Sequence, residues 1–204
     1  MNGSGRILYE HDFQADTGDF VLEGKGTYAI GDGRLVLDDS VAQSGLTLWL
    51  KREFRAPLRI VYEAEVLEPE LANNANLFFL ARTLQDEAAW TERRSGAYPE
   101  YHDRCRMYIL TMTGDMAGQQ ALTGWTRLRK NPGFELLSED ESVKTRAGTP
   151  YRIEIRADGQ RIECLLDGRR IHDVPDAAAY SAGAIGFRTW KTRLCIRRFR
   201  VERP

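Results

Sequence analysis

The sequence predicts an all-β fold: an antiparallel β-sandwich of the jelly-roll kind, with one or two short helices. Three observations predict it. Several segments alternate apolar and polar residues with the period of two that marks a half-buried strand. Asp-Gly dipeptides separate some of these segments, and no strand pattern alternates with a long helical one. We therefore expect packed antiparallel sheets rather than a parallel sheet covered by helices.

The strands can be placed in order along the chain. In residues 58–66, Ile60, Tyr62 and Ala64 share one face and charged side chains take the other. Residues 150–156 repeat this pattern, and Asp158-Gly159 and Asp167-Gly168 then predict two consecutive hairpins, because glycine accepts the positive φ of such turns. Further strands are expected at residues 34–37, 46–50, 77–82, 101–111, 184–190 and 194–201. Short helical pieces fit only residues 84–92 and 176–180, and residues 115–123 and 138–142 are expected to be loops.

Composition describes an ordinary globular protein and excludes some partners. The 204 residues include 29 Lys and Arg against 30 Asp and Glu, a formal net charge of -1, so a general nucleic-acid binder is not expected. No apolar run approaches the roughly 18 residues of a membrane helix, so no membrane partner is expected. Three cysteines without C-x-x-C spacing and a polar N-terminus favour a cytoplasmic location. One domain over residues 1–204 is expected, since no linker divides the chain.

Residues 93–109 hold the most informative cluster of polar side chains. If residue 100 onward is one regular strand, alternate side chains share a face. The face opposite the apolar Cys105, Met107 and Ile109 then carries an acid, an imidazole, guanidiniums and a phenol: Glu100, His102, Arg104, Arg106 and Tyr108, with Tyr98 near its edge. We interpret this row as a candidate site, with Tyr98, Glu100 and His102 as candidate catalytic residues, while a salt-bridged exposed face explains the spacing equally well.

Two other segments can contribute to the same surface. An extended segment over residues 124–133 places Trp125, Arg127 and Arg129 on one face, with Lys130 beside them. The strand at residues 184–190 directs Arg188 and Trp190 away from the core. Aromatic rings suit the C–H faces of sugars, and arginine suits carboxylates through its planar fork, so all six join Arg104, Arg106 and Tyr108 as candidate substrate-binding residues. Ordinary packing at a sheet margin is the alternative for either tryptophan.

Several familiar kinds of site are absent from the sequence. The histidines are scattered, with no H-E-x-x-H or Cys/His grouping, so no zinc site is predicted. No P-loop, dinucleotide-binding glycine fingerprint or G-x-S-x-G elbow occurs. We therefore expect no cofactor.

Four segments resemble the YesU-like family of domains of unknown function. They are Tyr98-Pro-Glu-Tyr-His102, the Leu-Arg-Lys-Asn-Pro-Gly-Phe of residues 128–134, residues 77–79 and residues 185–188. The resemblance extends from about Leu8 to the C-terminus. It implies the concanavalin A-like lectin/glucanase fold, a glycan held on the concave sheet, and a structural calcium of the kind common in that superfamily. Related proteins are encoded beside pectin-type (rhamnogalacturonan) degradation enzymes, which implies a carbohydrate ligand.

Three functions remain open on these grounds. The first is an enzyme acting on an acidic oligosaccharide. In β-elimination, Arg104, Arg106 or Arg129 would serve as the cation, and His102 or Tyr98 as base and acid. In hydrolysis, Glu100 would serve as the acid. The E-x-D-x-x-E string of the superfamily's glucanases is missing, which puts retaining hydrolysis in doubt. The second is a non-catalytic saccharide-binding protein, and the third an assembly protein that forms a homodimer through a sheet. The Glu100/His102 pair favours the enzyme slightly.

Overall fold

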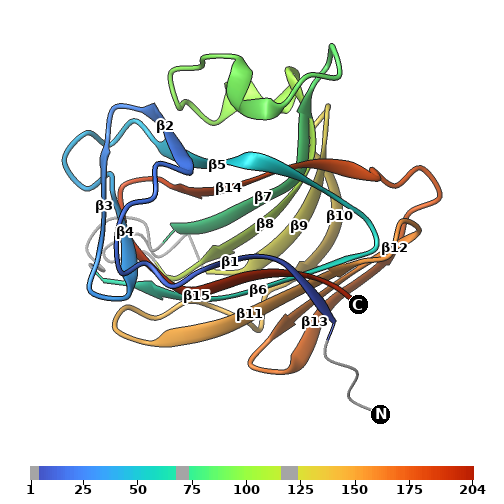
Figure 1. Ribbon diagram of the computed structural model, residues 1–204. Coiled ribbons are helices and arrows are strands. Elements are labelled where there is room, and N and C mark those ends of the chain that lie inside the picture. The colour runs from blue at the N-terminus through green and yellow to red at the C-terminus, as the bar shows by residue number, and fades with distance from the viewer. Residues whose placement is uncertain (1–4, 68–73, 116–123) are drawn as a thin grey trace.

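The computed structural model describes residues 5–67, 74–115 and 124–204, and they form two antiparallel sheets packed face to face (Figure 1). One sheet has eight described strands in the order β13 (Arg169–Pro175), β12 (Arg161–Leu166), β11 (Pro150–Ala157), β6 (Leu58–Val66), β15 (Arg193–Arg203), β4 (Arg34–Asp38) and β3 (Thr27–Gly31), with β1 (Arg6–His11) also paired to β15. The other has seven, in the order β10 (Glu135–Asp140), β9 (Thr126–Asn131), β8 (Cys105–Thr113), β7 (Asn74–Thr83), β14 (Ala182–Thr189), β5 (Leu46–Arg55) and β2 (Phe20–Gly24). The predicted β-sandwich is confirmed.

The two predicted Asp-Gly hairpins are present. Strands β11 and β12 pair with Ile155 opposite Cys164, and β12 and β13 pair with Cys164 opposite His172. Asp167 and both glycines have positive φ, as these turns require. The main core lies between the sheets, where residues such as Leu37 and Phe199 meet Phe79 and Phe187 and are fully or almost fully buried.

Residues 84–104 form an additional layer outside the two sheets, and this layer covers part of the outer face of the seven-stranded sheet. This cover segment stands above the sheet in Figure 1 and contains the 3-10 helix η1 (Ala89–Thr91) and the single-turn helix α1 (Pro99–His102). Beneath it, Trp49, Phe78 and Ile109 of the sheet pack with Tyr101 in a second apolar cluster. Both faces of the sheet are therefore buried over the region that the cover segment occupies.

The expected strand over residues 101–111 is wrong in its first four residues. Pro99 occupies the start of α1, where a missing N–H costs nothing, and β8 begins only at Cys105. The expected facing of β8 is also reversed: Tyr108 and Leu110 point into the main core, while Met107 and Ile109 point outward beneath the cover segment. Apolar residues could not identify the core side because the strand is buried on both faces.

Three smaller expectations also change. Residues 84–92 supply only the short η1, and residues 176–180 form turns without a helix. The acidic residues 138–140, expected in a loop, belong to β10. Most of the loop expected at residues 115–123 lies outside the described residues.

Candidate functional site

The outer face of the seven-stranded sheet carries a continuous row of polar residues, one from each strand. Residues directly opposite each other in an antiparallel pair point to the same face. Following the register across the sheet gives the polar row Glu139, Arg127, Thr111, Asn76, Arg188, Thr47 and Glu23. Most of this row was missed at the sequence level, although Asn76 inside the apolar run of β7 was a signal that could have identified it.

The neighbouring row on the same face is mainly apolar and lies under the cover segment. It contains Leu136, Arg129, Ile109, Phe78, Gly186, Trp49 and Val21. Gly186 is required here, because a Cβ at this position would lie 2.6 Å from the Trp49 ring. The indole therefore lies against the backbone of β14, and the cover segment packs on it.

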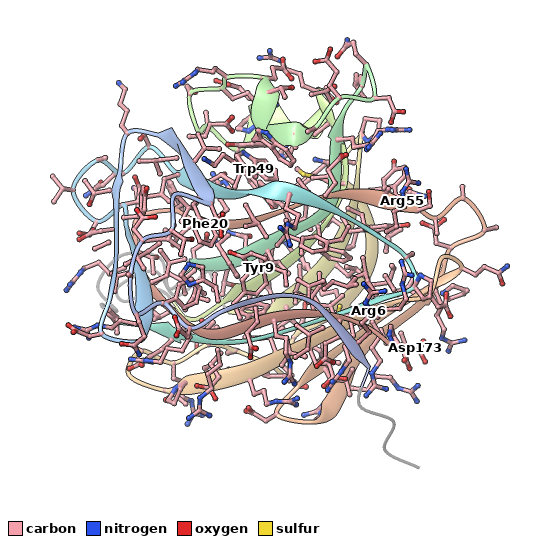
Figure 2. All side chains as sticks on the ribbon, in the orientation of Figure 1. Arg6, Tyr9, Phe20, Trp49, Arg55 and Asp173 are labelled. Carbon is pink, nitrogen blue, oxygen red and sulfur yellow. The ribbon has the colours of Figure 1, made fainter. Side chains whose placement is uncertain are left out.

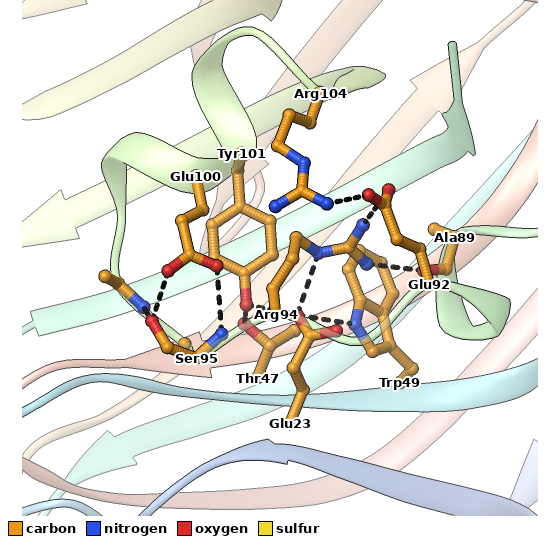
Figure 3. A network of polar contacts seen from close by, with 12 residues as sticks. Glu23, Thr47, Trp49, Ala89, Glu92, Arg94, Ser95, Glu100, Tyr101 and Arg104 are labelled. Atoms are coloured by element: carbon orange, nitrogen blue, oxygen red, sulfur yellow. Dashed lines mark hydrogen bonds and ion pairs between the residues drawn. The ribbon is translucent and has the colours of Figure 1, made fainter. Parts of the chain in front are cut away.

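A buried ion-pair network fixes the cover segment to the polar row (Figure 3). Arg94, whose side chain is fully buried, donates from Nε to Glu23 at 3.1 Å and from Nη1 to Glu92 at 2.9 Å. The Tyr101 hydroxyl donates to the same Glu23 carboxylate and lies 3.0 Å from the Thr47 hydroxyl. A buried guanidinium needs such pairing, so this network holds the cover segment in one position.

Three arginines and four aromatic rings of this face form a connected surface, which we call the arginine–aromatic patch. Arg127 stacks on Trp125 at 3.6 Å and Arg129 on Phe134 at 4.1 Å, measured from the guanidinium carbon to the ring centroid. Phe134 stacks on His102 at 3.8 Å, and the edge of Tyr98 packs on His102 at 4.9 Å. The patch consists of Tyr98, His102, Trp125, Arg127, Arg129, Phe134 and Arg188.

Arg188 is the most deeply buried arginine of the patch, at 2% exposure. Its guanidinium carbon lies 4.3 Å from the Tyr98 ring centroid, and Nη2 donates to the Gly96 carbonyl at 3.2 Å. Gly96 has φ of 91° and no room for a Cβ, which would lie 2.4 Å from the Gly45 carbonyl oxygen. Neither Arg188 nor Arg129 forms an ion pair with a carboxylate of the described chain, and burial holds the pKa of both below its ordinary value.

The structure brings the rings of Tyr98 and His102 into contact, and burial shifts the pKa of each side chain. Burial lowers the pKa of His102, opposed by Asp103 and aided by Arg129 and Arg188, so this setting favours the neutral imidazole. Burial raises the pKa of Tyr98, while its contact with Thr111, 3.4 Å between hydroxyl oxygens, and the nearby arginines oppose the rise. The His102 Nε2 atom is buried and has no hydrogen-bond partner within the described chain.

Glu100 and Arg104 do not join this patch. Glu100 and His102 stand two positions apart on α1, where side chains do not face each other. The Glu100 carboxylate instead accepts hydrogen bonds from the hydroxyl and backbone N–H of Ser95, which lower its pKa. Arg104 pairs with Glu92 in the cover segment. The expected Glu100/His102 pair is therefore wrong as a geometric unit.

Arg106, Tyr108 and Lys130 lie together away from the patch, around Tyr180. The Tyr108 hydroxyl and the Lys130 ammonium both donate to Asp176 at 2.6 Å, and Tyr108 packs on Tyr180 at 5.2 Å between ring centroids. Arg106 lies over the same ring at 5.8 Å. The alternation along β8 and β9 separates these three residues from Arg127 and Arg129, so the expected single surface is divided in two.

Trp190 follows the end of β14, two residues beyond Arg188. Its indole Nε1 donates to the Gln43 carbonyl at 3.2 Å, and Lys191 lies over its ring at 4.6 Å. It packs at a sheet margin, outside the patch.

The described residues show no cluster of metal-ligating side chains for the structural calcium that the resemblance implies, and that calcium stays a prediction. Calcium takes six to eight oxygen ligands, several of them carboxylates. No group of three or more His, Cys, Asp or Glu side chains that could hold a metal ion occurs within residues 5–67, 74–115 and 124–204. Over the same ranges, none of the helices has the length and apolar character to cross a membrane.

Comparison with solved structures shows the fold. The crystal structure of a protein of unknown function with a galectin-like fold, from Bacillus subtilis, matches with a TM-score of 0.83 and 23% identity, over 100% of this chain and 98% of that chain. The carbohydrate-binding module CBM66 from Bacillus subtilis matches with a TM-score of 0.63 and 14% identity, over 90% and 95%. The exoplasmic/lumenal domain of VIP36, in its Ca²⁺/Man3GlcNAc-bound form, matches with a TM-score of 0.67 and 8% identity, over 93% and 85%.

Sequence comparison identifies the family without identifying an activity. None of the curated proteins matches the chain. The model of a family described as a domain of unknown function, DUF6250, matches residues 41–199, which is most of the chain. The chain therefore belongs to the DUF6250 family.

Proposed function

We propose that the protein binds an acidic saccharide at the arginine–aromatic patch. The observation that carries the proposal is that Arg129, a half-buried guanidinium stacked on Phe134, pairs with no carboxylate of the described chain. A guanidinium is a bidentate partner for carboxylates, and a cation without one favours an anionic ligand.

The accessible edge of the patch has the chemistry that a uronic acid requires. The Arg127 side chain is 25% exposed, lies against Trp125 and pairs with Glu139, whose carboxylate a uronate carboxylate would displace. An indole face packs on the C–H face of a sugar ring, while the adjacent guanidinium reaches a carboxylate on the same ring. We propose a saccharide of the pectin or rhamnogalacturonan type, and the resemblance to the YesU-like proteins supports this choice. The likeness of the fold to CBM66 and VIP36 supports a carbohydrate ligand.

The proposal is tested by calorimetric titration with oligogalacturonides and with the same oligosaccharides after their carboxyl groups are reduced to alcohols. We expect binding only of the acidic form, weakening as salt rises because the contact is ionic. Arg129→Gln should weaken binding about tenfold, equivalent to about 1.4 kcal/mol. The control is Arg161→Gln, an exposed arginine of the eight-stranded sheet paired with Asp173. Equal binding of the reduced oligosaccharide, or an equal loss in both variants, would overturn the proposal.

A second candidate function, β-elimination on the same ligand, is favoured by the contact between His102 and Tyr98. A neutral imidazole can take the proton α to a uronate carboxylate, and the electrons of that C–H bond form the new C=C bond as the C–O bond at the neighbouring carbon breaks. The Tyr98 hydroxyl can give its proton to the departing oxygen, while Arg129 stabilises the charge that develops on the carboxylate. The neutral state of His102 that burial favours is the state a base needs.

Absorbance of the new C=C bond separates the enzyme from the binder. If the protein is a lyase, His102→Gln and Tyr98→Phe should abolish turnover of oligogalacturonides while calorimetric binding remains, and Arg161→Gln should leave turnover unchanged. Binding without turnover in the natural protein would leave a saccharide-binding protein and remove the elimination mechanism.

A further inference from the structure

A second cationic site lies at one end of the sandwich, away from the arginine–aromatic patch. A cavity of about 300 Å³ is lined by Arg55, Arg82, Asp86, Arg106, Tyr180 and Ser181, among others. Figure 2 labels Arg55 at this end of the molecule. The lining carries three guanidiniums against one carboxylate, so the cavity favours an anion.

Two of these arginines are brought together by the sheet. Arg82 and Arg106 stand directly opposite each other on β7 and β8. Like charges in that position repel. An irregularity in β7 between Phe79 and Arg82, where Leu80 has φ of 51°, creates this pairing. The strand is therefore distorted in a way that brings two cations together.

The carboxylates nearby compensate these cations only in part. Asp86 bridges the two guanidiniums, at 3.0 Å from Arg82 Nη1 and in contact with Arg106 Nη2, and Glu53 accepts from Arg82 Nη2 at 2.5 Å. The Asp86 side chain is 63% exposed, so its carboxylate can move away into solvent. Arg55, the third cation, pairs with no carboxylate of the described chain.

The cavity-lining arginines also have unused hydrogen-bonding capacity. The Nε atoms of Arg82 and Arg106 are buried, and neither has a partner within the described ranges. Oε1 of Glu53, beside Arg82, is likewise a buried acceptor without a partner there. Buried polar atoms are normally satisfied, so the two guanidiniums have hydrogen-bonding capacity that the described residues do not use. A ligand in the cavity would present anionic oxygens to the arginines.

We infer that this cavity binds a small oxyanion, the phosphate or carboxylate group of a small hydroxylated molecule, which displaces Asp86 from Arg82 and Arg106. The site is independent of the saccharide proposal, because Arg106 and Arg82 lie apart from Arg127, Arg129 and Arg188. Its volume suits a molecule the size of one sugar ring rather than a polymer.

Calorimetric titrations at low salt with inorganic phosphate, glucose 6-phosphate and glucuronate test this inference, with glucose as the uncharged control. We expect the anions to bind and glucose not to bind, and the comparison of glucose 6-phosphate with glucuronate to identify the preferred group. Arg55→Gln and Arg106→Gln should each raise Kd about tenfold. Asp86→Asn should lower Kd several-fold, because it removes the internal competitor. Arg104→Gln is the matched control, since Arg104 also follows α1 and pairs with an acid, Glu92, but lies outside the cavity lining.

The opposite effects of the two kinds of variant make the test decisive. Arg55 is exposed, so Arg55→Gln should fold normally even if Arg106→Gln does not, and circular dichroism checks each variant. The inference is overturned if no anion binds, if Arg104→Gln weakens binding as much as Arg55→Gln, or if Asp86→Asn fails to tighten it. Oligogalacturonide binding at the patch should be unchanged in Arg55→Gln, so the two proposals can fail separately.

Discussion

The guanidinium of Arg188 lies over the ring of Tyr98, 4.3 Å from its centroid, and joins β14 to the cover segment. We expect Tyr98→Ala to lower the free energy of unfolding by about 3–5 kcal/mol, because it leaves a cavity and removes the ring from a buried cation. Tyr98→Phe keeps the ring and loses only the contact with Thr111, so its cost should stay below about 1.5 kcal/mol. Urea denaturation measures both, and equal costs would show that the ring contact does not stabilise the fold.

The Glu23–Arg94 pair should be the most sensitive ion pair of the cover segment. Glu23→Gln leaves the buried Arg94 without one of its two carboxylates and should cost about 3–5 kcal/mol in urea denaturation. Glu139→Gln is the control in the same polar row: it breaks the more exposed pair with Arg127 and should cost less than about 1 kcal/mol. A small effect of Glu23→Gln would mean that apolar packing alone holds the cover segment.

His172 should make the protein less stable as the pH falls. Burial lowers the pKa of this histidine to about 4, while its ordinary value is 6.5. Between these values the unfolded chain binds a proton that the folded protein excludes, so the free energy of unfolding should decrease as pH falls from about 6.5 to about 4. NMR titration of the imidazole gives its pKa directly. His172→Gln should remove this part of the pH dependence, and an unchanged profile would assign it to other groups.

Glu154 should contribute a separate loss of stability at lower pH. Hydrogen bonds from Arg59 are the main cause that lowers the pKa of this carboxyl from 4.5 to about 2. Because the folded value lies below the unfolded one, the stabilisation is complete above about pH 4.5 and is lost as pH falls towards 2. Glu154→Gln should be less stable at pH 7 and should show a flatter profile between pH 4.5 and 2 in denaturant titrations. A profile as steep as that of the natural protein would contradict this assignment.

Local patterns predicted most of the strands but not the position of the cover segment. The alternation in residues 58–66 and the Asp-Gly turns after residue 157 are properties of a few consecutive residues, and both appear as expected. The turn at Pro99 could not be separated from the following strand, because residues 100–104 fit an alternating pattern equally well. The side chains of β8 could not be assigned to the correct face, because the cover segment that buries the outer face is visible only in the tertiary structure.

The candidate site was predictable in part. Arg127 and Arg129 share a face of β9, and Tyr98 lies beside His102, as the sequence indicated. The polar row itself could not be predicted, since it combines one residue from each of seven strands whose order in the sheet differs from their order in the sequence. Arg188 contacts Tyr98 only because the strands take that order in the sheet.

The pairing of β1 with β15 places Arg6 opposite Arg203, so the first and last described strands are neighbours (Figure 1). A short linker could join these strands, and new termini could be opened at the exposed Asp158-Gly159 turn with every sheet pairing preserved. Such a circular permutant would carry a fluorescent reporter on the hairpin between β11 and β12, in the sheet opposite the arginine–aromatic patch. If the patch binds the proposed saccharide, the protein could be developed as a sensor whose label lies away from that ligand.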